Sequence, residues 1–225
     1  MKKVLSVVMV FAMMASLAAC GSGSKFKKHQ NKNIKAAEEA CDASEGSSKQ
    51  KKKFVKNSTD KDFYEDGVYF TFEQDELEDV AESGNTFEGT DVESDQLTNM
   101  FVFRKTINDD DSAVYSIVME LDTKDAAEEV FESFTGRYTK TEKSLKKAAK
   151  QGDIEYAVDG SDTEYSLIAI NNDEEEVMSA YTKLDGKVIV MVAYEGSDDS
   201  DLLDEYYEYM SVAGYTDMEA LLEEA

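Results

Sequence analysis

The stretch VMSAYTKLDGKVIVMVAY, residues 177–194, indicates most directly how the chain folds. Its two halves, 177–183 and 188–194, are rich in the β-branched and aromatic residues that strands favour. Between them, Asp185-Gly186 suits a tight turn, because both residue types tolerate positive φ. The stretch therefore predicts a β-hairpin.

The sequence on either side extends this hairpin into a larger sheet with helices. Further strands are predicted at about 68–72, 101–103, 114–121, 154–158 and 165–170, and helices at about 124–138, 140–151 and 200–212. The second helix is expected to stop at Gly152, where glycine readily adopts a left-handed cap. These elements predict an α+β fold, an antiparallel sheet with helices packed on one face.

The first and last of these helices share one apolar pattern, i, i+1, i+4, i+5, i+8, at an offset of 76 residues. The positions are Ala126, Ala127, Val130, Phe131 and Phe134 in one helix, and Leu202, Leu203, Tyr206, Tyr207 and Met210 in the other. Each helix also follows two predicted strands. Two diverged ββα units would explain the pattern, and ordinary amphipathic helices are the alternative.

The N-terminus has the features of a secretory signal. Lys2-Lys3 precede an apolar run of fourteen residues, Val4 to Leu17, and small residues follow. A helix that spans a bilayer needs roughly twenty apolar residues. This run is therefore expected to direct export and not to remain as a membrane span.

Leu17-Ala18-Ala19-Cys20, followed by Gly21, resembles the lipobox of bacterial prolipoproteins. The resemblance implies that a peptidase recognises residues 17–19, removes the signal peptide 1–19, and leaves Cys20 bearing a diacylglyceryl group. Two acyl chains, such as palmitate, hold a protein stably on a membrane. The expected location is the extracytoplasmic face of the cell membrane, or the outer membrane in a two-membrane host. An ordinary secretory signal that contains a cysteine is the alternative.

Charge divides the exported part in two. Residues 25–56 hold ten lysines against four acidic residues, whereas residues 57–225 hold 12 basic against 45 acidic residues. Residues 20–62 are therefore predicted to be the lipidated cysteine and a basic, flexible tether, with a short helix at 32–44. Residues 63–225 are predicted to be an acidic α+β domain. Its negative charge argues against nucleic acid as a partner.

The sequence has no signature of a His, Cys or Ser catalytic site, and no cofactor is expected. His29, the only histidine, lies in the predicted tether and is interpreted as a solvated side chain. Cys41 has no intramolecular partner if Cys20 is acylated, so it is expected to be buried or to pair with another chain. These two residues alone cannot supply a zinc site.

Carboxylates leave two chemical alternatives open. A pair of them could hydrolyse glycosidic bonds if one were held protonated and one ionised. Dense acidic clusters at 109–111, 173–176 and 198–201 could bind calcium weakly, but none has the spacing of a dedicated calcium loop, and no metal site is predicted. A small-ligand carrier with an apolar pocket is a third alternative.

One basic segment stands out within the acidic domain. At 100° per residue, five lysines fall within one arc of the predicted helix 140–151, opposite the apolar Leu145, Ala148 and Ala149: Lys140, Lys143, Lys146, Lys147 and Lys150. They could balance the charge of the domain's own carboxylates, or form a docking face for an anionic partner such as an envelope polymer, a lipid headgroup or an acidic protein. The sequence thus favours a non-catalytic, lipid-anchored interaction or sensing module.

Overall fold

The computed structural model describes residues 23–56, 64–72, 76–77, 87, 90–107, 112–152 and 154–224. The predicted signal peptide, Cys20 and the acidic cluster 109–111 lie outside these ranges. No helix within them is long and apolar enough to cross a membrane.

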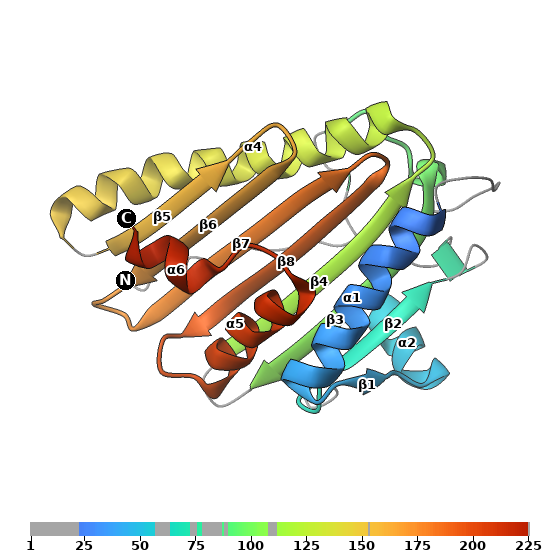
Figure 1. Cartoon of the computed structure of the whole chain (residues 1–225), viewed down its shortest axis with the longest axis horizontal. Helices are drawn as coiled ribbons and strands as arrows, with labels where there is room; N and C mark the ends of the chain where they lie inside the picture. Colours follow the sequence, from blue (N-terminus) through green and yellow to red (C-terminus); the bar gives the residue numbers. More distant parts are fainter. Residues whose placement is uncertain are drawn as a thin grey trace.

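The described chain is built on one eight-stranded sheet, in the order β1-β2-β3-β4-β8-β7-β6-β5 (Figure 1). Apart from the parallel pair β1–β2, neighbouring strands are antiparallel. The strands are β1 (Ser44–Glu45), β2 (Val68–Phe72), β3 (Leu97–Ile107), β4 (Ser112–Leu121), β5 (Ile154–Gly160), β6 (Glu164–Asn171), β7 (Glu176–Asp185) and β8 (Val188–Ser197).

The predicted hairpin forms β7 and β8. Asp185 pairs with Val188 across the turn, and Gly186 takes the positive φ of 71° that the turn requires. On its other side β8 pairs with β4, so this hairpin lies in the middle of the sheet.

Five helices complete the described fold: α1 (Gly23–Cys41), α2 (Ser48–Val55), α4 (Lys124–Ala148), α5 (Asp201–Ala213) and α6 (Met218–Glu223). Short 3₁₀ turns span Ser94–Gln96 and Ala149–Gln151. α4 begins where the Thr123 hydroxyl accepts a hydrogen bond from Ala126 N, and α5 ends at Gly214 in a left-handed cap.

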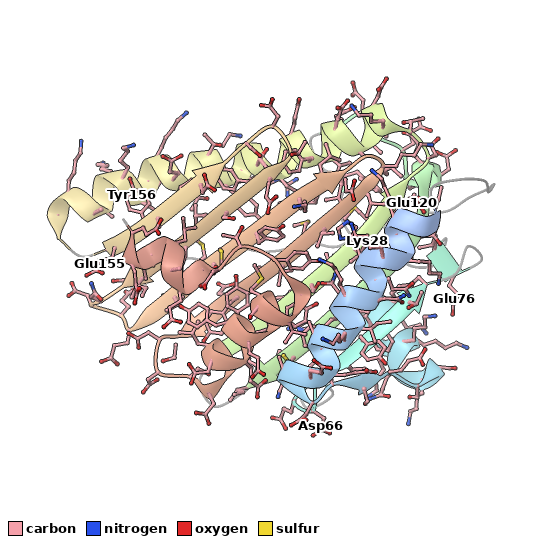
Figure 2. All side chains as sticks on the ribbon, in the orientation of Figure 1. Lys28, Asp66, Glu76, Glu120, Glu155 and Tyr156 are labelled. Carbon is pink, nitrogen blue, oxygen red and sulfur yellow. The ribbon has the colours of Figure 1, made fainter. Side chains whose placement is uncertain are left out.

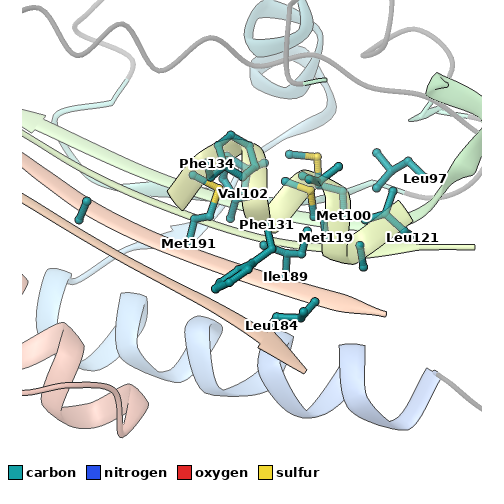
Figure 3. Close-up of a cluster of buried hydrophobic side chains, with 14 of the residues drawn as sticks. Leu97, Met100, Val102, Met119, Leu121, Phe131, Phe134, Leu184, Ile189 and Met191 are labelled. Atoms are coloured by element: carbon teal, nitrogen blue, oxygen red, sulfur yellow. The ribbon is translucent and has the colours of Figure 1, made fainter. Parts of the chain in front are cut away.

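The sheet has a helical layer on each face, so the α+β class is confirmed but the placement of all helices on one face is wrong. α4 packs its apolar side on one face, with Phe131 and Phe134 over Met119 and Met191 (Figure 3). α1 and α5 cover the other face. The reason is visible in β8, where every residue from Val188 to Tyr194 is buried. A strand with two apolar sides needs a cover on both.

The two predicted ββα units exist as hairpins followed by helices, β3-β4-α4 and β7-β8-α5. Their helices nevertheless lie on opposite faces of the sheet and differ in length, 25 residues against 13. A duplicated unit would pack its helix in the same way twice, so the packing gives no support for a repeat.

The predicted helices 124–138 and 140–151 form a single long helix, α4, that continues into the 3₁₀ turn Ala149–Gln151. Thr139, between the two predicted helices, lies within this helix, and its hydroxyl donates back to the Thr135 carbonyl one turn earlier. The predicted end at Gly152 is confirmed, with φ of 91°.

The predicted flexible tether is wrong for residues 23–56. α1 spans Gly23–Cys41, in place of the short helix expected at 32–44, and packs along α5 and the sheet. Phe26, Ala36, Ala37 and Cys41 are at most 1% exposed. The small alanines permit a close approach of α1 to α5 and the sheet.

Candidate docking face

The five lysines singled out in the sequence lie at the C-terminal end of α4 and in the turn after it. Leu145, on the side that faces the sheet, is buried. All five lysines are exposed on the outer side of the helix. We call them the basic face: Lys140, Lys143, Lys146, Lys147 and Lys150.

Four of the five lysines form no ion pair with any residue that the structure describes. The exception is Lys146, whose Nζ lies 3.7 Å from Glu142 Oε1, one turn back on the same helix. Direct ion pairs with the described residues therefore do not account for the basic face. Lys146 and Lys147 lie in the last turn of α4, where a positive charge interacts favourably with the negative end of the helix dipole. Lys140 and Lys143 lie too far from that end for this interaction.

The charge of α4 reverses along its length. Its first half carries Asp125, Glu128, Glu129 and Glu132, of which Glu128 pairs with Lys124. From Arg137 to Lys150 there are six basic residues and one acidic residue. Along α4, the basic face is thus a short patch that follows an acidic segment.

The two acidic clusters within the described residues lie in a turn and at a helix cap. Residues 173–175 lie in the exposed β6–β7 turn, where Glu175 has a positive φ of 54°, and Glu176 begins β7. In the cluster 198–201, the N-cap of α5 is Ser200, whose hydroxyl accepts from Leu202 N. Within the described ranges there is no group of three His, Cys, Asp or Glu residues that could hold a metal ion.

His29 is buried, contrary to the solvated side chain that the tether prediction implied. Because α1 docks on the sheet, the His29 ring faces the end of β7, and its Nε2 lies 3.1 Å from Asp185 Oδ2. Asp185 also pairs with Lys25. With Nε2 donating to Asp185, His29 Nδ1 is left buried with no hydrogen-bond partner among the described residues.

The environment of His29 disfavours its charged form. Burial lowers the pKa of the imidazole below its ordinary value, and this outweighs the raising influence of Asp185. Lys28 and Lys32 on the same helix lower the pKa further. A proton on Nδ1 would be a buried donor without an acceptor. This adds to the free-energy cost of the charged form and agrees with the lowered pKa.

We expect the free energy of unfolding to fall as the pH is lowered from about 7 to about 5. In the unfolded chain His29 takes up a proton near its ordinary pKa of about 6.5, whereas the folded chain resists protonation to lower pH. The unfolded state then binds more protons, so stability is lost as the pH falls. Urea midpoints measured across this range should decline less steeply for H29Q, because the chain has no other histidine. An unchanged slope would contradict the assignment.

Cys41, at the end of α1, is buried and free. Burial raises the pKa of its thiol to about 12. The thiol is therefore protonated at neutral pH and shielded, which fits a small core residue and not a bond to another chain.

Comparison with known proteins assigns no family. No family model matches the chain, and no curated protein matches its sequence. Two solved structures are weakly similar. The extracellular domain of PknH from Mycobacterium tuberculosis aligns at a TM-score of 0.33 and 12% identity, over 70% of this chain and 78% of that one. PsbP from the cyanobacterium Synechocystis sp. PCC 6803 aligns at a TM-score of 0.28 and 16% identity, over 65% and 79%. At these TM-scores neither likeness bears on function.

Proposed function

We propose that this chain is a lipid-anchored, extracytoplasmic interaction or sensing module that docks an anionic envelope partner through the basic face of α4. Cys20 is the anchor in this proposal, on the strength of the lipobox resemblance. The proposal assigns the chain no catalytic step.

The observation that carries the docking role is the set of unpaired lysines. The chain has a net charge of −25, so carboxylates that could neutralise a lysine are abundant. Lys140, Lys143, Lys147 and Lys150 nevertheless point to solvent with no carboxylate partner among the described residues. Such a patch attracts an external anion and orients its approach.

A retention assay tests this role. The chain starting at Gly21 keeps every described element and lacks the lipid, so its binding to isolated envelopes of the producing cell reports on the domain alone. We expect K140Q/K143Q/K147Q/K150Q to be retained at least tenfold less at low salt, since each lysine near an anionic surface contributes about 1 kcal/mol. Added salt should release the unsubstituted chain.

A matched control removes four exposed charges elsewhere, in K35Q/K49Q/K52Q/K56Q, on α1, on α2 and at the C-cap of α2. This variant has the same net charge as the test variant and should be retained like the unsubstituted chain. Circular dichroism checks that both are folded. Equal retention of all three chains would refute docking through the basic face.

A further inference from the structure

The lipid anchor of the proposed function would join the domain at one end of its long axis. α1 begins at Gly23, three residues after Cys20, and a chain segment of that length reaches at most about 11 Å. α1 is fixed at this end by Phe26 in the core and by the contacts of Lys25 and His29 with Asp185. The β7–β8 turn therefore lies on the membrane side of the anchored domain.

α4 begins at this same end and leads away from it. Lys187, in the β7–β8 turn, donates through Nζ to the carbonyl of Asp122, and its own carbonyl accepts from Leu121 N at 2.9 Å. α4 starts two residues after Asp122 and runs for 25 residues, about 37 Å. Figure 1 shows α4 following the long axis to the end opposite the start of α1. Figure 2 labels Lys28 in the half of the molecule where α1 begins, and Tyr156 in the other half, close to α4.

The unpaired lysines form a single row. They are spaced three, four and three residues apart, so their side chains follow one side of the helix over about 15 Å. The acidic first half of α4 lies between this row and the membrane end. A broad anionic surface such as a bilayer would meet those carboxylates together with the lysines, whereas a single polymer strand would meet the lysines alone.

Resting on the proposed function, we propose that the basic face binds a linear polyanion beyond the membrane surface, at the end of the domain that points away from its lipid anchor. The partner class is an envelope polymer with an anionic group on each repeat. In this orientation the headgroups of the anchoring membrane are too far from the row of lysines to be its binding partner.

A binding assay with long-chain polyphosphate tests the partner class. The chain starting at Gly21 is titrated with polyphosphate and, separately, with vesicles of phosphatidylglycerol and phosphatidylcholine in equal parts. We expect polyphosphate to bind at low salt, K140Q/K143Q/K147Q/K150Q to bind about tenfold or more weakly, and K35Q/K49Q/K52Q/K56Q to bind like the unsubstituted chain. Stronger binding to vesicles at equal anion concentration would overturn the inference.

The outcomes separate this inference from the proposed function. If envelopes retain the domain through the basic face but polyphosphate does not bind, docking stands and the linear polyanion is wrong. If the substitutions leave envelope retention unchanged, docking itself is wrong.

Energy transfer tests the orientation. The lipidated mature chain is labelled at K28C or K150C and placed on vesicles that carry an acceptor lipid; Cys41 is buried and does not compete for the label. We expect strong transfer from position 28 and much weaker transfer from position 150. The same chains with C20A should stay off the vesicles and show no transfer. Equal transfer from both labels would place α4 along the membrane and overturn the orientation.

Discussion

Replacing Asn33 with leucine is expected to lower the free energy of unfolding by about 3–5 kcal/mol, because it breaks a buried polar network. Asn33 is fully buried between α1 and the sheet. Its Nδ2 donates to the His29 carbonyl at 2.7 Å and to the Tyr215 hydroxyl at 2.6 Å. Its Oδ1 accepts from Ser116 Oγ at 2.8 Å and from the Tyr209 hydroxyl at 2.7 Å. All four hydrogen-bonding positions of the amide are thus used.

Leucine has a similar volume but leaves these groups without their partner. Ser116 and Tyr209 are themselves fully buried, so water cannot replace the lost bonds. Each buried polar group that loses its partner costs about 1–3 kcal/mol. Tyr215 is only partly buried and contributes less to the loss.

Urea denaturation followed by circular dichroism at 222 nm measures the effect. N31L is the matched control, because Asn31 lies on the exposed side of the same helix, two residues away. We expect N31L to change stability by less than about 0.5 kcal/mol. A similarly small change for N33L would show that α1 is not docked as described.

The sequence predicted the parts of the fold that depend on local signals. The β7–β8 hairpin follows from Asp185-Gly186 between two strand-forming runs, and its observed register agrees. The start of α5 at Ser200 and the end of the long helix at Gly152 follow from the chemistry of caps. In each case the deciding residues lie within a few positions of the feature.

The role of α1 could not be predicted in this way, because its partners are distant in sequence. Asn33 meets side chains 83 to 182 residues away, and His29 meets Asp185, 156 residues away. The local pattern of lysine, asparagine and alanine is the same in a solvated linker. A prediction from composition alone therefore assigns such polar residues to a loop, although in the folded chain they pair with one another across the core.

For the candidate site, the sequence indicated the residues but not their surroundings. The arc of lysines follows from helical periodicity, and the structure places all five on the exposed side of α4. Whether carboxylates from other elements neutralise them depends on tertiary packing. The direction of α4 relative to the start of α1 also depends on tertiary packing. The proposed geometry of docking depends on this direction.

Replacing Phe26 with alanine is expected to lower the free energy of unfolding by about 3–5 kcal/mol. Phe26 is the single large apolar side chain in residues 23–33, and it is 1% exposed in the core between α1 and the sheet. The rest of this segment is held by polar contacts. Truncation leaves a cavity at the point where α1 is fixed to the sheet.

The loss should also be visible locally, because Phe26 holds the start of α1 in the core. Trypsin should cut at Lys25, Lys27 and Lys28 faster in F26A than in the unsubstituted chain, at urea concentrations where both remain folded. K28A, which removes a neighbouring exposed side chain, should change neither stability nor cleavage at Lys25. If residues 20–62 were a free tether, F26A would behave like K28A. A loss of about 3–5 kcal/mol would instead establish that the folded domain begins at α1.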